Sequence, residues 1–274
     1  MKFTPLLRAL GTSAIALTLA TAALSPAQAR RAGASAAQTF QLFSREQLSQ
    51  SLAPCKEQFP GGVPLDIQGF AKERKATGLC FDAFADVYSS QTKTPIVTVE
   101  RLNRASIQEA QVEERTNRFF PDPRLKAGDR ASLDDYRGSG YDRGHNAPAA
   151  DQSSSRGMAQ CFSLADMSPQ SSKNNRGVWA KVETDVRKYV LRARGDVFVY
   201  TGPLFLDSPV VTIGSGRVWV PSHLFKLVYD ETTHRSWAYI LPNTDDARLS
   251  APVTYESFVR RTGYQFLRGL PVVG

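Results

Sequence analysis

Residues 138–148 read Gly-Ser-Gly-Tyr-Asp-Arg-Gly-His-Asn-Ala-Pro. The centre of this stretch is typical of a short β-strand, along which side chains alternate so that residues i and i+2 share a face. Arg143 and His145 are therefore expected to point the same way, with Gly144 leaving the backbone between them unobstructed. An arginine that holds phosphate oxygens, beside a neutral imidazole that accepts a proton from water, suits chemistry on an anion.

A candidate helix follows in the stretch NNRGVWAKVE at residues 174–183. Residues spaced four apart climb one side of a helix, and here they are Asn175, Trp179, Glu183 and Arg187. A neighbouring apolar stripe is expected to pack against the core; it consists of Val178, Val182, Val186 and Val190. Asn175 offers its side-chain oxygen to a hard cation such as magnesium near the helix start. Glu183 is placed to orient a metal-bound water and to meet Arg187 at i+4.

These motifs together resemble the DNA/RNA non-specific endonucleases of the ββα-metal (His-Me finger) type. The family signature has an aspartate-arginine-glycine-histidine tetrad, then a Pro-Gln step, then an asparagine and a glutamate on one helix. In this chain they are Asp142-Arg143-Gly144-His145, Ser168-Pro169-Gln170, Asn175 and Glu183. The flanking sequence also matches the family, in the segments 135–140, 201–204 and 220–223. The resemblance covers roughly residues 70–270.

The resemblance implies an enzyme that hydrolyses phosphodiester bonds in both DNA and RNA, without sequence specificity. His145 is expected to act as general base on a water, and Asn175 to hold a Mg²⁺ ion, with Mn²⁺ able to substitute. Arg143 would offset charge on the phosphoryl oxygens. Glu183 would orient a metal-bound water, and Arg187 would help to position the phosphate.

A second tier of candidate site residues comprises Asp142, Asp166 and Asn174. Family members commonly carry asparagine where this chain has Asp166. An aspartate there would strengthen metal binding or raise the pKa of His145, or it would simply cap a turn. These alternatives stay open at the level of sequence.

Three arginines before the motif, Arg115, Arg118 and Arg124, are candidates for phosphate contacts. Each is equally well explained as part of a solvated, charged connection. The formal net charge of +8 favours a polyanionic partner, because binding releases the polymer's counterions. This agrees with the motif but is weak by itself.

The N-terminal residues 1–29 combine a basic start, a short apolar run and Ala27-Gln28-Ala29, which is the layout of a secretory signal peptide. A membrane anchor would need a longer uninterrupted apolar run, so no membrane association is expected after cleavage. The sequence thus predicts export to the periplasm or out of the cell. Residues 30–54 are expected to form a flexible lead-in, and residues 55–274 a single endonuclease domain.

The three cysteines are dispersed and lack the spacing of a zinc site. In an oxidising compartment Cys55 and Cys80 are the preferred disulfide pair, because the enclosed Pro60-Gly61-Gly62 turn can bring them together. Cys161, beside Phe162 in an apolar segment, is expected to be a buried free thiol.

The remaining pattern predicts an α+β fold, with a central, mostly antiparallel sheet, flanking helices and the ββα-metal active-site element at one edge. The predicted strands are residues 80–88, 95–100, 158–164, 196–201, 218–220, 223–229 and 236–241. Residues 255–262, followed by Gly263, predict a last short helix.

Two functions of other classes compete with the endonuclease. A catalytically silent, basic nucleic-acid-binding module would share the charge and fold but would not need His145, Asn175 and Glu183 together. A metal-dependent phosphodiesterase for small substrates would share the ions but would need a closed pocket. The sequence identifies no inhibitor protein.

Overall fold

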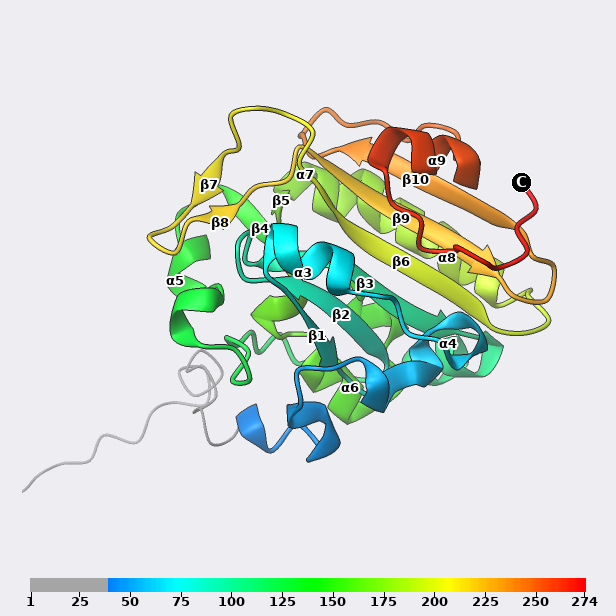
Figure 1. The fold of residues 1–274 in the computed structure, drawn as a ribbon, viewed down its shortest axis with the longest axis horizontal. Coiled ribbons are helices and arrows are strands. Elements are labelled where there is room, and N and C mark those ends of the chain that lie inside the picture. The colour runs from blue at the N-terminus through cyan, green and yellow to red at the C-terminus, as the bar shows by residue number, and fades with distance from the viewer. Residues whose placement is uncertain (1–38) are drawn as a thin grey trace, which may run out of the picture. The chain divides into compact units, whose positions relative to one another are not determined.

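The computed structural model describes residues 39–274 and is organised around a six-stranded sheet with the order β1-β2-β3-β6-β9-β10 (Figure 1). Every neighbouring pair of strands in this sheet is antiparallel. The strands are β1 Ala76–Cys80, β2 Phe84–Ser89, β3 Thr94–Leu102, β6 Val197–Leu204, β9 His223–Asp230 and β10 Ser236–Pro242. The predicted α+β fold with a mostly antiparallel sheet is confirmed.

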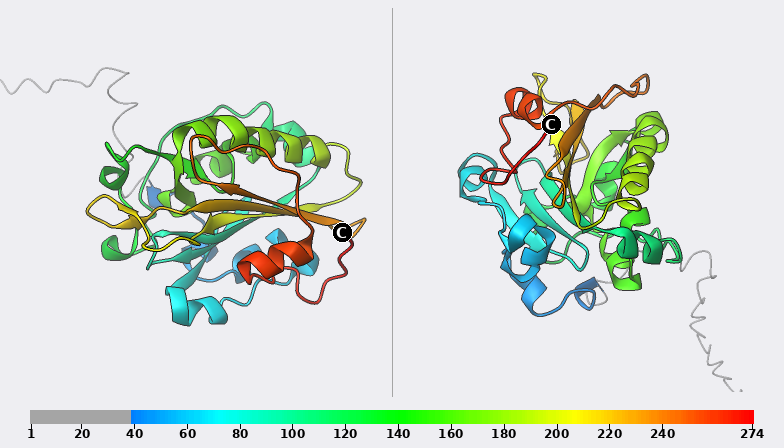
Figure 2. Two further views of the ribbon diagram at one scale, coloured as in Figure 1. Left: turned by 90° about the horizontal axis from the view of Figure 1, so that it is seen from above. Right: turned by 90° about the vertical axis from the view of Figure 1, so that its right-hand side faces the viewer.

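Helices lie on both faces of the sheet. Figure 2 shows α8 on one face and α3 and α9 on the opposite face. The α-helices are α3 Gln68–Arg74, α4 Arg104–Ala110, α5 Leu133–Tyr136, α6 Ser155–Gln160, α7 Ser172–Asn174, α8 Ala180–Val190 and α9 Tyr255–Thr262. Short 3₁₀ turns are η1 Glu46–Leu48, η2 Ala53–Gln58, η3 Pro60–Gly62, η4 Ala127–Asp129, η5 Ala149–Asp151 and η6 Leu164–Asp166. One π-helical turn, η7 Asn175–Trp179, joins α7 to α8.

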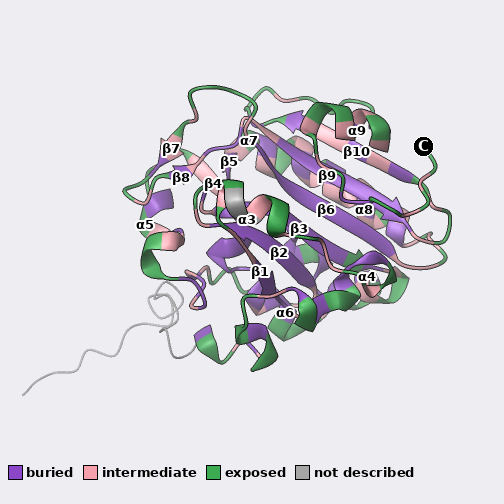
Figure 3. Ribbon diagram, in the orientation of Figure 1, coloured by how far each residue is buried: buried purple, intermediate pink, exposed green. Residues whose placement is uncertain are grey.

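Because side chains alternate along each strand, the sheet contributes to two apolar layers, one on each of its faces. Val197 and Val199 of β6 pack with the Val186 and Val190 side of α8. The intervening residues of β6 face the other way, where they join Phe225, Phe258 and Phe266. The strands are consequently buried along most of their length, whereas the outer helix faces are exposed (Figure 3). The predicted valine stripe is therefore buried at Val182, Val186 and Val190, and only partly at Val178.

Polar side chains also lie buried between the sheet and the helical layer that contains α8. We call Asp86, Thr98, Glu100, Thr201 and Lys226 the polar belt; each is at most 1% exposed. Four of them stand opposite one another across β2, β3, β6 and β9, in the order Asp86, Thr98, Thr201, Lys226. The segments that follow β3 and β5 cover the sheet face that carries the polar belt. Its residues are therefore buried, because a strand residue is solvated only where nothing covers its face. The belt forms the floor beneath the candidate site.

The ββα element begins with a separate two-stranded sheet of β4 Tyr141–His145 and β5 Met167–Ser171, which pair antiparallel. The chain passes from β5 directly into α7, η7 and α8. A third small sheet pairs β7 Thr212–Ile213 with β8 Val218–Trp219. The predicted strand at residues 158–164 is wrong: most of that segment is α6 and the turns after it, because the Ser154 side chain caps a helix by accepting the N–H of Gly157.

The N-terminal part of the described chain is tied to the sheet. Cys55 and Cys80 form the predicted disulfide, with their Cα atoms 5.5 Å apart, and Cys161 is a buried free thiol. Residues 39–54, expected to belong to a flexible lead-in, contain η1 and bury Phe43 and Leu52, because these apolar side chains complete two of the core clusters. The predicted signal peptide at residues 1–29 lies outside the described residues. Among residues 39–274, no helix has both the length and the apolar character to cross a bilayer.

Candidate active site

Strand β4 presents Arg143 and His145 on one face, as the alternation predicted. Both contact the ring of Phe119: the Arg143 guanidinium carbon lies 4.1 Å from its centroid, and the imidazole centroid of His145 lies 5.6 Å from it. The imidazole also meets the ring of Phe162 edge-on at 4.9 Å. The two aromatic rings thus fix the arginine and the histidine side by side.

The imidazole of His145 is neutral at any pH at which the protein would work. Burial, followed by the positive charges of Arg115 and Arg143, lowers the pKa of His145 to about 3. Its Nε2 atom is buried and has no hydrogen-bond partner among the described residues. A neutral imidazole beside two cations accepts a proton readily only from a group that is itself close to losing it, such as a water approaching phosphorus.

Gly144 separates these two residues at a point where a side chain would collide with strand β5. A Cβ at this position would lie 2.1 Å from Oε1 and 2.7 Å from Cβ of Gln170, which sits on the paired strand β5. The Gln170 amide nitrogen in turn donates to Oδ1 of Asn174 at 2.8 Å, and Asn174 donates to the carbonyl of Pro242 at 2.7 Å. Asn174, a second-tier candidate, is therefore a buried anchor that fixes the start of the helix to β5 and β10.

Asn175 is held against β4 by Asp142. The Asn175 amide nitrogen donates to Oδ2 of Asp142 at 3.0 Å, and the same carboxylate accepts hydrogen bonds from Arg176 and Ser172. Burial raises the pKa of Asp142, but the hydrogen bonds from Arg176, Asn175 and Ser172 outweigh this effect and bring the pKa below its usual value. Asp142 thus stays ionised and orients Asn175, whose Oδ1 accepts no hydrogen bond from the described residues.

The donor set fits a hydrated hard cation. Among residues 39–274, no group of three or more histidine, cysteine, aspartate or glutamate side chains is arranged to hold a metal. The Oδ1 atom of Asn175 is a neutral oxygen donor, and the Asp142 carboxylate is occupied by hydrogen bonds. Magnesium accepts such a sparse protein shell because it keeps several of its waters, whereas zinc sites use three or four protein ligands.

Glu183 is half-buried in a highly charged setting. The pKa of Glu183 is raised to about 7. Burial is the largest cause, the positive charge of Lys226 lowers the pKa, and the negative charge of Asp151 raises it. The expected i,i+4 pair with Arg187 is not formed. Arg187 instead donates to Oδ1 of Asp151 at 2.9 Å and to the Thr184 hydroxyl at 3.1 Å, because the Asp151 carboxyl on η5 is almost fully buried and needs a partner.

Sequence reasoning missed the groups that surround Glu183, namely Glu100, Asp151 and Lys226. Both carboxylate oxygens of Glu100 are buried without a hydrogen-bond partner, and burial raises its pKa well above the usual range. Lys226 donates to the Thr201 hydroxyl at 2.6 Å, and its ammonium lies 5.8 Å from the Trp179 ring centroid. For Glu100 and Lys226 the available signal was a charged residue within a mostly apolar strand, in TVERL and in HLFKLVYD.

Asp166 does not face the candidate cation site. Its carboxylate accepts the backbone N–H of Ala147 at 2.9 Å and lies 3.2 Å from the Thr98 hydroxyl, while its carbonyl accepts from the Asn146 backbone and side chain. Asp166 therefore fixes the two residues that follow His145. It is not among the groups that shift the pKa of His145, so the expectation that it raises this pKa is wrong.

The three candidate phosphate-contact arginines differ in exposure. Arg115 is exposed, lies over the Phe162 ring at 5.1 Å and donates to Asn117; Arg118 is also exposed. The assignment of Arg124 is wrong. Its side chain is fully buried between the rings of Phe43 and Phe81, pairs with Asp122 at 2.7 Å and donates to the carbonyl of Cys80, so it has no access to a phosphate.

Comparison with known proteins gives a family and several relatives. The sequence model of the DNA/RNA non-specific endonuclease family matches residues 62–273. Nuclease 1, mitochondrial, of Schizosaccharomyces pombe is 32% identical in an alignment 212 residues long, which covers 69% of this chain and 65% of that protein. Nuclease EXOG, mitochondrial, of Homo sapiens is 32% identical in an alignment 180 residues long, which covers 60% of this chain and 48% of that protein. The chain thus spans from about half to just under two thirds of these relatives.

A solved structure shares the fold. The structure of an EndoG/EndoGI complex, described as showing the mechanism of EndoG inhibition, superposes with a TM-score of 0.63. The superposition covers 77% of this chain and 91% of that chain, with 26% sequence identity. The similarity supports the α+β fold with a six-stranded antiparallel sheet and flanking helices.

The curated relatives correct the predicted location. The relatives from Schizosaccharomyces pombe and Homo sapiens are mitochondrial nucleases. They point away from the periplasm and from secretion, and the prediction of export is wrong in this respect. The short apolar segment and Ala-Gln-Ala of residues 1–29 are not sufficient by themselves to define the destination of a chain.

Proposed function

Because this chain belongs to the DNA/RNA non-specific endonuclease family, a family of metal-dependent endonucleases, we propose that it cleaves phosphodiester bonds within both DNA and RNA. The observation that carries this proposal is the arrangement around β4. The neutral His145 and Arg143 share one face of the strand, and Asp142 of the same strand orients Asn175. The catalytic domain proposed here comprises residues 55–274.

His145 is the proposed general base. Its ring is neutral and can accept a proton as the attacking water becomes acidic, and the two rings beside it hold its orientation. Because Nε2 is enclosed, the attacking water is expected at Nδ1. Transfer of the water proton to this nitrogen as the oxygen attacks phosphorus contributes typically 10²–10⁴-fold to the rate.

Asn175 is the proposed magnesium ligand, through its free Oδ1, and manganese is expected to substitute because it favours the same oxygen donors. When bound, the cation would neutralise charge on the scissile phosphate and on the leaving oxygen. Asp142 acts through Asn175: by accepting the amide N–H at 3.0 Å, it fixes the orientation of the side-chain amide and leaves the carbonyl oxygen for the cation.

The remaining charges position the phosphate and water. Arg143 lies over Phe119 and has no ion pair among the described residues, so it is free to bind phosphoryl oxygens. Arg187 is oriented by Asp151 and Thr184 and would contact the phosphate beside Arg115. Glu183 would orient a water. These groups recognise phosphate and water rather than base edges, which supports cleavage with little sequence or sugar specificity.

The test is cleavage of plasmid DNA and of RNA with Mg²⁺, with Mn²⁺ and with excess chelator. His145→Ala should lower kcat by roughly 10²–10⁴-fold while DNA affinity, measured in chelator, is retained. Asn175→Ala should lose the Mg²⁺-dependent activity. The matched control is His234→Asn, since His234 lies in a turn with φ 58° that asparagine tolerates.

Three outcomes would contradict the proposal. Full cleavage in excess chelator would exclude the metal, and wild-type turnover by His145→Ala would exclude the base. Binding of DNA without cleavage would indicate a catalytically silent module. Hydrolysis of small phosphate esters without cleavage of either polymer would indicate the small-substrate phosphodiesterase.

A further inference from the structure

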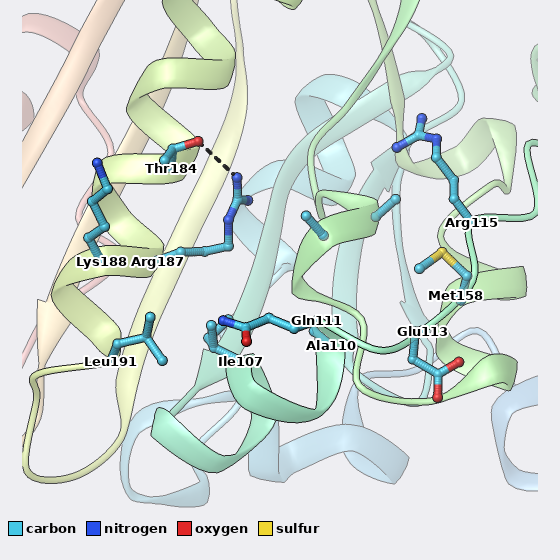
Figure 4. A pocket seen from close by; sticks show the side chains of 12 residues that line it. Ile107, Ala110, Gln111, Glu113, Arg115, Met158, Thr184, Arg187, Lys188 and Leu191 are labelled. Carbon is cyan, nitrogen blue, oxygen red and sulfur yellow. Dashed lines mark hydrogen bonds between the residues drawn. The ribbon is translucent and has the colours of Figure 1, made fainter.

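A pocket of about 420 Å³ opens between α4, α8 and the η5–α6 segment (Figure 4). Helix α4 contributes Ile107 and Ala110, and Met158 comes from α6. The side chains of Thr184, Arg187 and Lys188 and the following Leu191 line the opposite wall (Figure 4). We call this cavity the α4–α8 pocket. Its volume lies in the range that suits one small organic ligand and excludes a duplex.

The walls of the α4–α8 pocket divide into an apolar part and a cationic part. Ala150 and Leu191 offer the accessible apolar surface, and the almost fully buried Ile107, Ala110 and Met158 hold the wall behind it in place. Arg115, Arg187 and Lys188 supply positive charge, and the one carboxylate, Glu113, accepts a hydrogen bond from Ser155 at 3.0 Å. An apolar surface beside an excess of cations suits a ligand that has a flat organic part and a phosphate.

The α4–α8 pocket shares residues with the candidate active site. Arg187 follows Glu183 by one helical turn, and its charge acts on that carboxyl group. Arg115 acts electrostatically on both His145 and Glu183. A ligand anchored by Arg115 and Arg187 therefore continues directly from the place where the scissile phosphate would lie. The larger pocket lined by Tyr200 and Phe266 shares none of these residues.

We propose that the α4–α8 pocket binds one nucleoside of the substrate strand, the one joined directly to the scissile phosphate. This inference rests on the proposed endonuclease function. The apolar wall takes the base or sugar face, and Arg115 and Arg187 take the phosphate. No aromatic ring lines the pocket, so binding does not depend on stacking with a particular base. The occupant must leave the helical stack to enter, as in enzymes that extrude a nucleotide.

The experiment compares substrates that contain a single diester bond. They are bis(4-nitrophenyl) phosphate, which has no nucleoside, and the 4-nitrophenyl esters of thymidine 5′-phosphate and thymidine 3′-phosphate. Ala150 is exposed and lines the pocket, so Ala150→Trp fills it without altering the core. The matched control is Ala251→Trp, at an exposed alanine outside the pocket. The kcat/KM of each nucleoside ester is divided by that of bis(4-nitrophenyl) phosphate.

Ala150→Trp should lower this ratio about tenfold or more for one of the two thymidine esters, because one methylene group too many in an apolar pocket is already worth about 10–200-fold and an indole ring adds more. The sensitive isomer identifies the side of the phosphate on which the nucleoside sits. The Ala251→Trp control should leave both ratios unchanged. If the wild-type protein cleaves polymers but Ala150→Trp changes neither ratio, the inference is overturned while the endonuclease function stands. If the wild-type protein cleaves no diester, both fail.

Discussion

Asp166→Asn should change how the stability of this protein depends on pH. Asp166 and Asp86 are both fully buried, and a single hydroxyl, that of Thr98, lies 2.6 Å from Oδ1 of Asp86 and 3.2 Å from Oδ1 of Asp166. One hydroxyl proton cannot satisfy two carboxylates. Burial raises the pKa of both groups, and the negative charge of Asp86 raises the pKa of Asp166 further. The folded pair therefore retains a proton that the unfolded chain has released.

The sign of the effect follows from linkage. Because the folded-state pKa values are raised, the folded chain binds more protons than the unfolded chain above about pH 4. The stability that the pair contributes is fully present below that pH and is lost as the pH rises through the raised folded-state pKa. Each retained proton gives the free energy of unfolding a slope of about −1.4 kcal/mol per pH unit. Asp166→Asn removes one such proton, so the free energy of unfolding of the variant should fall less steeply than that of the wild type as the pH rises above 5, by up to about 1.4 kcal/mol per pH unit.

Urea unfolding followed by circular dichroism at pH 5, 6 and 7, at constant ionic strength, measures this difference. Only the slope with pH is diagnostic, because the amide also changes the hydrogen bonds to Ala147 and Thr98 at every pH. The control is Asp207→Asn, at an exposed aspartate. Parallel curves for the wild type and Asp166→Asn over this pH range would refute the reasoning, since they would mean that the pair holds no extra proton in the folded state.

Three further predictions concern single residues. The kcat/KM for DNA should rise as the pH increases through about 7, where Glu183 ionises, and Glu183→Gln should remove this limb of a pH–rate profile. Gly144→Ala should lower the free energy of unfolding by about 1–3 kcal/mol in urea titrations, because the new Cβ would lie 2.1 Å from a Gln170 oxygen. The control is Gly177→Ala, which should show no such loss because nothing lies within 4 Å of a Cβ at that position. Arg124→Ala should destabilise by about 3–5 kcal/mol, measured in the same way, because it leaves a buried carboxylate unpaired. Its cleavage rate, measured where the variant is folded, should remain unchanged.

The parts of the fold that were predictable from sequence depend on local periodicity. The alternation of side chains along a strand is sufficient to predict that Arg143 and His145 share one face of β4, and both contact Phe119 there. The helix α9 begins and ends at the predicted residues because Thr254 caps one end and Gly263, with φ 75°, terminates the other. Such signals depend only on residues that are close in sequence, and they do not depend on which other elements pack against the helix or strand.

The parts that were not predictable depend on what covers a residue. Arg115 and Arg124 look alike in sequence, yet one is exposed and the other is enclosed by Phe43 and Phe81. The apolar run at residues 158–164 suits a strand or a buried helix equally, and the cap at Ser154 decides for α6. The π-helical turn η7 likewise gives no signal in the periodicity, although it places Trp179 in the core and leaves Asn175 beside Asp142.

The polar belt shows why the sheet is more than a platform for the ββα element. Lys226 and Glu100 lie on central strands, and both act on the charge of Glu183 or of the groups around it. Unpaired burial of Glu100 disfavours the folded state, so a strand chosen for stability alone would carry an apolar residue there. Burial raises the pKa of Glu183 most, Lys226 on β9 lowers it and Asp151 on η5 raises it, which together bring this pKa to about 7. The charge of Glu183 therefore depends in part on Lys226, a strand residue that no substrate needs to touch.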